Sequence, residues 1–185
     1  GVPLAGLSRL TVAAKSPLTG CIGDSQCGGF FPAEFKFAGF DAVVVTGRAE
    51  RPVYLWLENG KYELRSAGHL WGRTTDEVQE TLRSELGDKR VEVLQCGIAG
   101  ENGVRFASLM NNANRANGRT GMGTVMASKN LKAVAVRGSL RPTLADTAGV
   151  KRLSCWGVEN LKNKDVYMLS QGGTAGSIAW SSDNG

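Results

Sequence analysis

Histidine and cysteine are scarce in this chain of 185 residues, and the cysteines are scattered. The only histidine is His69, for which we expect a structural role. Zinc ions and iron–sulfur clusters are held by closely spaced cysteine and histidine residues, and no Cys-x-x-Cys pair is present. We therefore expect reduced structural thiols before a disulfide, and a metal ligand last of all. The four cysteines are Cys21, Cys27, Cys96 and Cys155.

Long hydrophobic runs and a targeting leader are also missing. No run of 18 apolar residues occurs, so we expect no membrane-spanning helix. The first residues, GVPLAGLSRLTVAA, lack an initiator Met and a basic start, and Arg9 interrupts their apolar run. They indicate an internal strand rather than a signal peptide, and we expect a cytoplasmic protein.

Charge and composition leave the function open. The chain holds 22 Lys and Arg residues against 17 Asp and Glu residues, which gives a formal net charge of +5. Such an excess favours an anionic ligand or partner, although it is more often an ordinary solvated surface. With 42% hydrophobic residues, the chain can bury one core.

The segment Arg115–Gly138, RANGRTGMGTVMASKNLKAVAVRG, combines a glycine-rich turn, a helix start near Met122 and an apolar strand. Its spacing is neither the dinucleotide fingerprint Gly-x-Gly-x-x-Gly nor a Walker A loop. Its glycines let backbone amides approach a ligand, its arginines add positive charge, and a helix start offers unpaired amides. The turn therefore predicts an anion site, built from Gly118, Gly121, Gly123, Arg115 and Arg119.

The remaining patterns predict short strands first and helices later. Asn59-Gly60 is a strong hairpin signal between two strands, and Thr74 with Glu77 predicts a capping box. Asp146 predicts the N-cap of a helix that extends to about Leu161. The predicted strands are 7–14, 52–58, 61–65, 90–95 and 104–110, and the predicted helices are 75–86, 146–161 and one beginning within 173–180.

Two apolar segments, both of which we expect to form strands, repeat one another: Ala42–Arg48 (AVVVTGR) and Ala133–Ser139 (AVAVRGS). Each follows a glycine-containing turn and a short helix; the turns are 24–29 and 115–123, and the helices lie near 32–37 and 122–128. Buried Val- and Ala-rich strands generally look alike, which is the alternative explanation. We favour a duplicated unit, whose two turns face each other across a pseudo-twofold axis and suit a ligand with two similar halves.

Three blocks carry a family resemblance: Lys15–Gly20 (KSPLTG), Gly28–Val45 and Gly97–Val136. Together they resemble the N-terminal domain of the aldehyde ferredoxin oxidoreductases, from the first residue to about Gly138 and more weakly beyond. The resemblance implies an α+β fold. A mainly β platform of two pseudo-twofold related sheet units with short helices would occupy residues 1–140, and an α-helical domain would begin within 141–185.

The resemblance also implies a tungsten or molybdenum bis-pterin (molybdopterin) cofactor with a Mg2+ ion bridging the two pterin phosphates. Arg9 and Arg115 match arginines that contact the pterins, and Gly28, Ala116 and Gly118 match backbone contacts. The carbonyl groups of Gln26 and Ala116 would bind the magnesium ion. Gln26 stands where some members have Asn, which matters little for a backbone ligand. Surface arginines, an internal carboxylate partner and plain turn glycines are the alternatives.

The function implied is that of the cofactor-binding portion of an oxidoreductase, which oxidises aldehydes to carboxylic acids and transfers electrons through a [4Fe-4S] cluster to ferredoxin. The cluster ligands and the acid/base groups of the family are not in this chain, so we assign no catalytic residue. We expect a fragment of a longer enzyme that is inactive by itself and compatible with a homo-oligomer.

A non-catalytic module that binds a phosphorylated small molecule or nucleic acid is the alternative. Single-strand binders need exposed aromatic residues among basic ones. The phenylalanines around the helix near 32–37 have the pattern of a core instead, which argues against nucleic acid; they are Phe30, Phe31, Phe35, Phe37 and Phe40.

Overall fold

A computed structural model describes residues 2–4, 6–163 and 166–184 of the chain. The chain divides into two units. The first comprises Ser8–Thr143, and the second takes in the described residues of 2–7 and 144–184. All the residues matched to a cofactor site lie in the first unit.

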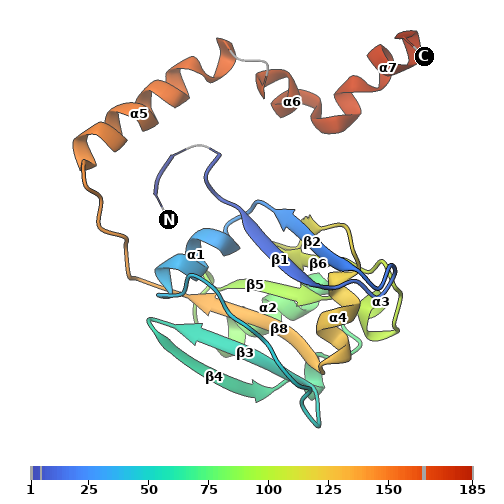
Figure 1. Cartoon of the computed structure of the whole chain (residues 1–185). Helices are drawn as coiled ribbons and strands as arrows, with labels where there is room; N and C mark the ends of the chain where they lie inside the picture. Colours follow the sequence, from blue (N-terminus) through green and yellow to red (C-terminus); the bar gives the residue numbers. More distant parts are fainter. Residues whose placement is uncertain (1, 5, 164–165, 185) are drawn as a thin grey trace. The chain divides into compact units, whose positions relative to one another are not determined.

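The first unit contains two β-sheets and several short helices (Figure 1), which confirms the α+β class. The smaller sheet pairs β1 (Leu10–Lys15) with β2 (Ile22–Cys27) in antiparallel orientation. The larger sheet has the order β4-β3-β8-β5-β6-β7, in which only β3 and β8 run parallel. Its strands are β3 (Val53–Glu58), β4 (Lys61–Ser66), β5 (Glu92–Cys96), β6 (Leu109–Asn111), β7 (Arg115–Asn117) and β8 (Leu131–Arg137).

Strand β8 lies at the centre of the larger sheet, and its first six residues are buried. One face of the sheet packs on α1 (Phe31–Phe37), α4 (Met122–Ser128) and the smaller sheet; the other packs on α2 (Thr75–Glu85). Successive residues of β8 therefore enter different cores, with Val134 in the first and Ala133 and Ala135 in the second. The remaining elements of this unit are η1 (Gly68–Leu70) and α3 (Ile98–Glu101).

Local sequence signals placed several elements correctly. Asn59 and Gly60 have φ angles of 47° and 82° and connect β3 to β4, as a two-residue hairpin turn requires. At the start of α2, the Thr74 side chain accepts a hydrogen bond from the Glu77 amide, and the Glu77 side chain accepts one from the Thr74 amide at 2.8 Å. The predicted capping box is confirmed.

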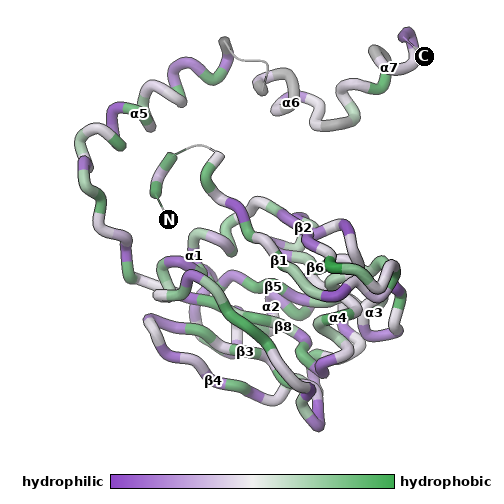
Figure 2. Tube along the Cα trace, viewed as in Figure 1, coloured by the Kyte–Doolittle hydropathy of each residue, from purple (hydrophilic) through white to green (hydrophobic). Residues whose placement is uncertain are grey.

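The predicted strand over Ala42–Arg48 is wrong. No strand is assigned there, and the side chains of Val43, Val44 and Val45 are 39%, 86% and 41% exposed. Figure 2 shows the segment as a hydrophobic stretch between α1 and β3. Its counterpart Ala133–Val136 forms the centre of β8. Apolar residues alone do not make a strand, because a strand also needs a neighbour to pair its backbone groups.

Other boundaries differ by a few residues. The predicted turn at 24–29 begins inside β2, which extends to Cys27. The predicted turn at 115–123 begins with strand β7. The predicted strand 104–110 is replaced by the shorter β6, Leu109–Asn111, so only its last two residues are in a strand. Pairing between these short segments is set by contacts distant in sequence, which local patterns do not report.

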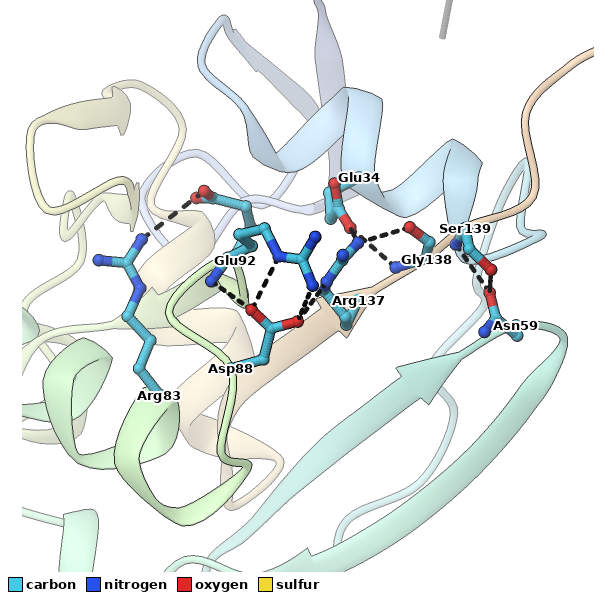
Figure 3. Close-up of polar contacts among 9 residues, drawn as sticks. Glu34, Asn59, Arg83, Asp88, Glu92, Arg137, Gly138 and Ser139 are labelled. Carbon is cyan, nitrogen blue, oxygen red and sulfur yellow. Dashed lines mark hydrogen bonds and ion pairs between the residues drawn. The ribbon is translucent and has the colours of Figure 1, made fainter.

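Helix α1 is fastened to the end of β8 by a chain of charges (Figure 3). The Glu34 carboxylate accepts hydrogen bonds from Arg137 Nη1 at 2.5 Å and from the Gly138 amide at 2.8 Å. Arg137 Nε donates to Asp88 Oδ2 at 2.7 Å. The side-chain hydrogen bonds from Arg90, followed by the one from Arg137, hold the pKa of Asp88 well below its usual range. The backbones also touch, because a Cβ atom on Gly138 would lie 1.9 Å from the Phe37 carbonyl carbon.

A buried ion pair between Lys132 and Glu101 joins β8 to α3, with side chains that are 0% and 3% exposed. Glu101 Oε2 also accepts a hydrogen bond from the Gly72 amide at 2.8 Å, and Lys132 Nζ donates to the Arg73 carbonyl at 3.3 Å. Buried charges persist when they are paired and further hydrogen-bonded, as these are.

From Thr147 onward, the described residues of the second unit are mostly helical. Asp146 caps its first helix by accepting a hydrogen bond from the Gly149 amide at 2.7 Å, as predicted. Within the described part of the chain, no helix has the length and apolar character that crossing a membrane requires. The helices of the second unit are α5 (Thr147–Asn160), η2 (Leu161–Asn163), α6 (Val166–Gly172), η3 (Gly173–Ser177) and α7 (Ile178–Asn184).

We expect Gly138→Ala to destabilise the first unit by about 3 kcal/mol, because the new methyl group meets backbone atoms that have no room to move. Gly68→Ala is the matched control. No atom lies within 4 Å of its new Cβ, so its effect should stay within about 0.5 kcal/mol. Urea unfolding of the two variants tests this, and equal midpoints would contradict it.

We expect Glu101→Gln to cost about 3 to 5 kcal/mol, because it leaves the Lys132 charge buried without its partner. Replacing both residues, by Glu101→Leu with Lys132→Met, should recover much of this loss. The free energy of unfolding of the single and double variants measures the coupling. A double variant less stable than Glu101→Gln would show that the pair matters for another reason.

Candidate functional site

The two sheets meet where β2 lies beside β7 and the turn that follows it. No strand pairing joins them; side chains do. Asn117 Nδ2 donates to the Ser25 carbonyl at 2.8 Å, and Thr120 Oγ1 donates to the Asp24 carbonyl at 3.2 Å. The Arg119 amide adds a long hydrogen bond of 3.4 Å to Ser25 Oγ. We call this junction the sheet seam.

A buried polar cluster of Cys27, Asn111 and Asn117 forms the inner side of the sheet seam. Asn111 Nδ2 donates to Cys27 Sγ at 2.9 Å and to the Gly28 carbonyl at 3.2 Å, and Cys27 Sγ donates to Asn117 Oδ1 at 2.9 Å. Asn111 Oδ1 is buried and has no hydrogen-bond partner among the described residues. Native structures contain few such groups.

Arg9, Gly28 and Arg115 come together around this cluster. Burial raises the pKa of the Cys27 thiol, while the hydrogen bond from Asn111 and the charges of Arg9 and Arg115 lower it less. The two exposed arginines therefore lie close enough to Cys27 for their charges to lower the pKa of its thiol. A Cβ atom on Gly29 would lie 3.2 Å from Arg115 Cγ and 2.3 Å from Asn111 Oδ1, so the turn that contains Gly28 and Gly29 touches β7.

Two of the predicted ligand glycines serve packing instead. A Cβ atom on Gly121, whose φ is +74°, would lie 2.0 Å from the Arg105 carbonyl oxygen, and one on Gly123 would lie 2.3 Å from that of Ser108. The Gly123 amide donates to the Ala107 carbonyl at 2.9 Å. The expectation that Gly121, Gly123 and this amide of α4 face a ligand is therefore wrong, because the neighbouring backbone already occupies that space.

Gly28 and Gly118 are different. Neither has the positive φ that favours glycine, and a Cβ atom on Gly118 would meet nothing within 4 Å. A Cβ atom on Gly28 would make only an ordinary contact of 3.5 Å, with the Ser8 carbonyl oxygen. The protein itself does not require glycine at either position, which is expected where a ligand needs the space.

The backbone that flanks the predicted ligands is in an unusual conformation. Asn112, Ala113 and Thr120 have φ angles of 51°, 54° and 64°, in the left-handed region that residues with a Cβ atom seldom adopt. Such conformations gather at functional sites, where the surrounding structure enforces them. Asn112 and Ala113 lie shortly before the stretch Arg115–Gly118, and Thr120 lies two residues after it.

A polar cavity of about 560 Å³ opens beside Arg115. The Glu92 carboxyl in its wall has a raised pKa because it is buried, and it lies 3.6 Å from Arg83 Nη2 (Figure 3). The Gln79 side-chain oxygen is buried there without a hydrogen-bond partner among the described residues. The lining residues are Gly29, Phe30, Gln79, Arg83, Glu92, Asn112, Asn114 and Arg115.

The residues matched to the cofactor lie on the accessible side of the sheet seam. Gly28 is half-buried, and the exposed ones are Arg9, Gln26, Arg115, Ala116 and Gly118. Along β2, the exposed Gln26 alternates with the buried Ser25 and Cys27. Sequence reasoning missed Ser25, Asn111 and Asn117. The sequence feature that could have indicated them is a polar residue at a strand position whose side chain points into the core.

Several smaller expectations can be compared with the structure. All four cysteines are free. His69 Nε2 lies 2.7 Å from Glu85 Oε1, in a structural pair. The described residues contain no group of three or more His, Cys, Asp or Glu side chains that could hold a metal ion. Phe31 and Phe37 are buried as predicted, but Phe30 is 71% exposed, because it precedes α1 at the rim of the polar cavity.

We expect alkylation by iodoacetamide to separate the cysteines into two classes, because the thiolate is the reacting form. Cys21 and Cys155 are exposed and serve as the internal control. Burial raises the pKa of Cys27, and it raises that of Cys96 to about 12, so both thiols should react at least about tenfold more slowly at pH 8. Peptide mass mapping measures the rates; a Cys27 as fast as Cys21 would contradict the buried cluster.

Known proteins resemble the chain over most of its length. The model of the family "Aldehyde ferredoxin oxidoreductase, N-terminal domain" matches residues 1–138. A tungsten-containing aldehyde ferredoxin oxidoreductase of Pyrococcus abyssi is 46% identical over 169 residues, which are 89% of this chain and 28% of the relative. An aliphatic sulfonate oxidoreductase, WOR-like subunit, of Pyrococcus furiosus is 35% identical over 143 residues, 71% of this chain and 23% of the relative.

A solved structure agrees with these relatives. The active site complex BamBC of benzoyl coenzyme A reductase, bound to 1,5-dienoyl-CoA, superimposes with a TM-score of 0.82 and 36% identity, over 88% of this chain and 25% of that chain. The chain spans about a quarter of the length of the relatives it matches. From the family match and these identities, the chain belongs to the aldehyde ferredoxin oxidoreductase family.

Proposed function

We propose that this chain is the cofactor-binding portion of a tungsten-pterin aldehyde:ferredoxin oxidoreductase. The whole enzyme would convert an aldehyde and water to a carboxylic acid, releasing two protons and passing two electrons through a [4Fe-4S] cluster to ferredoxin. Tungsten is favoured over molybdenum because the most similar of the relatives named above is described as tungsten-containing. Its name also supports an aldehyde as the substrate and ferredoxin as the acceptor.

The observation that carries the proposal is the accessible side of the sheet seam. Arg9 and Arg115 form no ion pair within the described residues, although both lie near Cys27. An unpaired guanidinium is a strong donor to phosphate, through charge-assisted hydrogen bonds of matched geometry. Beside these two cations, Gly28 and Gly118 leave open space at the backbone. Two cations and two open glycines fit a ligand that carries phosphate groups.

The bound tungsten-pterin would supply the redox chemistry, and the residues of this chain would hold it in place. Arg9 and Arg115 would neutralise the pterin phosphates. The backbone at Gly28, Ala116 and Gly118 would lie against the cofactor, where a side chain would obstruct it. The carbonyl oxygens of Gln26 and Ala116, on strands β2 and β7, would contribute to a Mg2+ site, since this hard cation takes oxygen ligands and commonly bridges phosphates.

In the cofactor-loaded enzyme, we expect Arg115→Ala to lower the tungsten and pterin content by about tenfold or more, because it removes a charge-assisted contact. Arg115→Lys should restore part of it, since Lys keeps the charge without the fork geometry. Arg51→Ala, at an exposed arginine outside the site, is the matched control. Metal analysis and pterin fluorescence give the readout. Full cofactor content in Arg115→Ala would show that Arg115 has a structural role only.

Gly118→Ala adds a second, independent variant to this experiment. Its methyl group meets no protein atom, so the unfolding midpoint of the cofactor-free 185-residue chain should not change, whereas the cofactor content of the loaded enzyme should fall. Normal cofactor content in Gly118→Ala would place the ligand elsewhere.

A further inference from the structure

The exposed segment Ala42–Thr46 has the composition of a buried strand but lacks the backbone hydrogen bonds that a paired strand makes. It consists of AVVVT, and β-branched residues of this kind favour strands. No hydrogen bond joins the backbone of 42–46 to any described residue of the chain. Figures 1 and 2 show it as a drawn-out hydrophobic connection between α1 and β3. An exposed row of unpaired amides and carbonyls with apolar side chains is a template for strand pairing.

Both ends of this segment are fixed. The Lys36 side chain pairs with Asp41 just before it. Lys129 Nζ donates to the Gly47 carbonyl at 3.0 Å, and the Ala49 amide donates to the Lys129 carbonyl at 3.1 Å just after it. The segment is therefore held in place at its ends while its centre makes no backbone contact. A pairing partner has to come to it.

An apolar cavity of about 280 Å³ separates this segment from β1. Ala42, Val43 and Val45 line one part of it, and the half-buried Leu10, Val12 and Ala14 of β1 line another. Among the described strands, β1 pairs with β2 alone, and two-stranded sheets have little stability by themselves. Most of the remaining lining belongs to the first core of the larger sheet, including Leu94, Leu109, Met126, Leu131 and Val134, and polar groups come from Thr11, Asp41 and Lys129. The cavity is thus an opening into a hydrophobic core.

We propose that Ala42–Thr46 is a β-strand of the assembled enzyme, completed by pairing with an extended apolar strand that also covers the cavity beside β1. The strand would come from the part of the polypeptide outside these 185 residues. The tungsten-containing relative matched over 169 residues has about three quarters of its length outside the match, which is ample chain to supply one. Main-chain hydrogen bonds would give the affinity, and alternate apolar side chains would enter the cavity.

This inference is independent of the proposed cofactor. It depends on the segment 42–46, β1 and the cavity, and none of the residues assigned to the cofactor lines that cavity. Loss of cofactor binding and loss of strand pairing would therefore appear in different measurements.

Hydrogen–deuterium exchange tests the pairing directly. In the 185-residue chain, the amides of 43–46 should exchange nearly as fast as in an unstructured peptide, with the amides of β8 as the protected control. In the polypeptide of the length of the relatives, the same amides should exchange at least about 100-fold more slowly. Fast exchange in both proteins would overturn the proposal. Protection in the 185-residue chain that grows with protein concentration would also overturn it, because a second copy would then be the partner.

Proline substitution separates backbone pairing from side-chain burial at the same positions. Because alternate amides of a strand point to opposite edges, either Val43→Pro or Val44→Pro must remove a donor to the new strand. In the longer polypeptide, at least one of them should lower the melting temperature well below that of the matched Val43→Ala and Val44→Ala variants. In the 185-residue chain, the proline and alanine variants should melt together. Equal effects of proline and alanine in the longer polypeptide would exclude backbone pairing.

Discussion

The side-chain hydrogen bonds across the sheet seam are the interactions on which the candidate site depends. Strands β2 and β7 are neighbours that do not pair, so buried asparagines satisfy the polar groups between them. Asn117 bonds the Ser25 carbonyl, and Asn111 bonds the Gly28 carbonyl. Leaving such groups unsatisfied costs about 1–3 kcal/mol each. Because these bonds form on the buried side, Gln26, Arg115 and Ala116 are left exposed on the other.

Helix α1 fixes the position of the turn at Gly28 and Gly29, which contacts the sheet seam. It begins two residues after Gly29, whose φ of 111° and close contact with Asn111 leave no room for a side chain. Phe31 is buried in the first core, and the Glu34 carboxylate is held by Arg137 and Gly138 at the end of β8. The turn at Gly28 is therefore fixed on one side by asparagine hydrogen bonds and on the other by an anchored helix. A rigid support of this kind is what a precisely oriented ligand needs.

Sequence reasoning was reliable where the deciding interactions are local. The Asn59-Gly60 turn, the Thr74/Glu77 capping box and the Asp146 N-cap each depend on atoms within four residues, and all three are present. It failed where partners are distant. The burial of Lys132 depends on Glu101 and on the backbone of Gly72 and Arg73. Ala42–Val45 has the pattern of a strand but pairs with no strand in the described part of the chain. The site residues followed from the family resemblance, whereas the asparagines that hold them follow from the coordinates alone.

Glycine illustrates why the motif had to be seen in three dimensions. Gly121 and Gly123 occur in the same turn as Gly118, yet neighbouring carbonyl groups crowd the first two and nothing crowds the third. One motif therefore contains glycines that the fold requires and one that only a ligand would require. The same distinction explains which positions are free to vary. The role proposed for the Gln26 backbone carbonyl would not depend on its side chain, which is exposed on β2. At Gly118, by contrast, even a methyl group would occupy the space proposed for the cofactor.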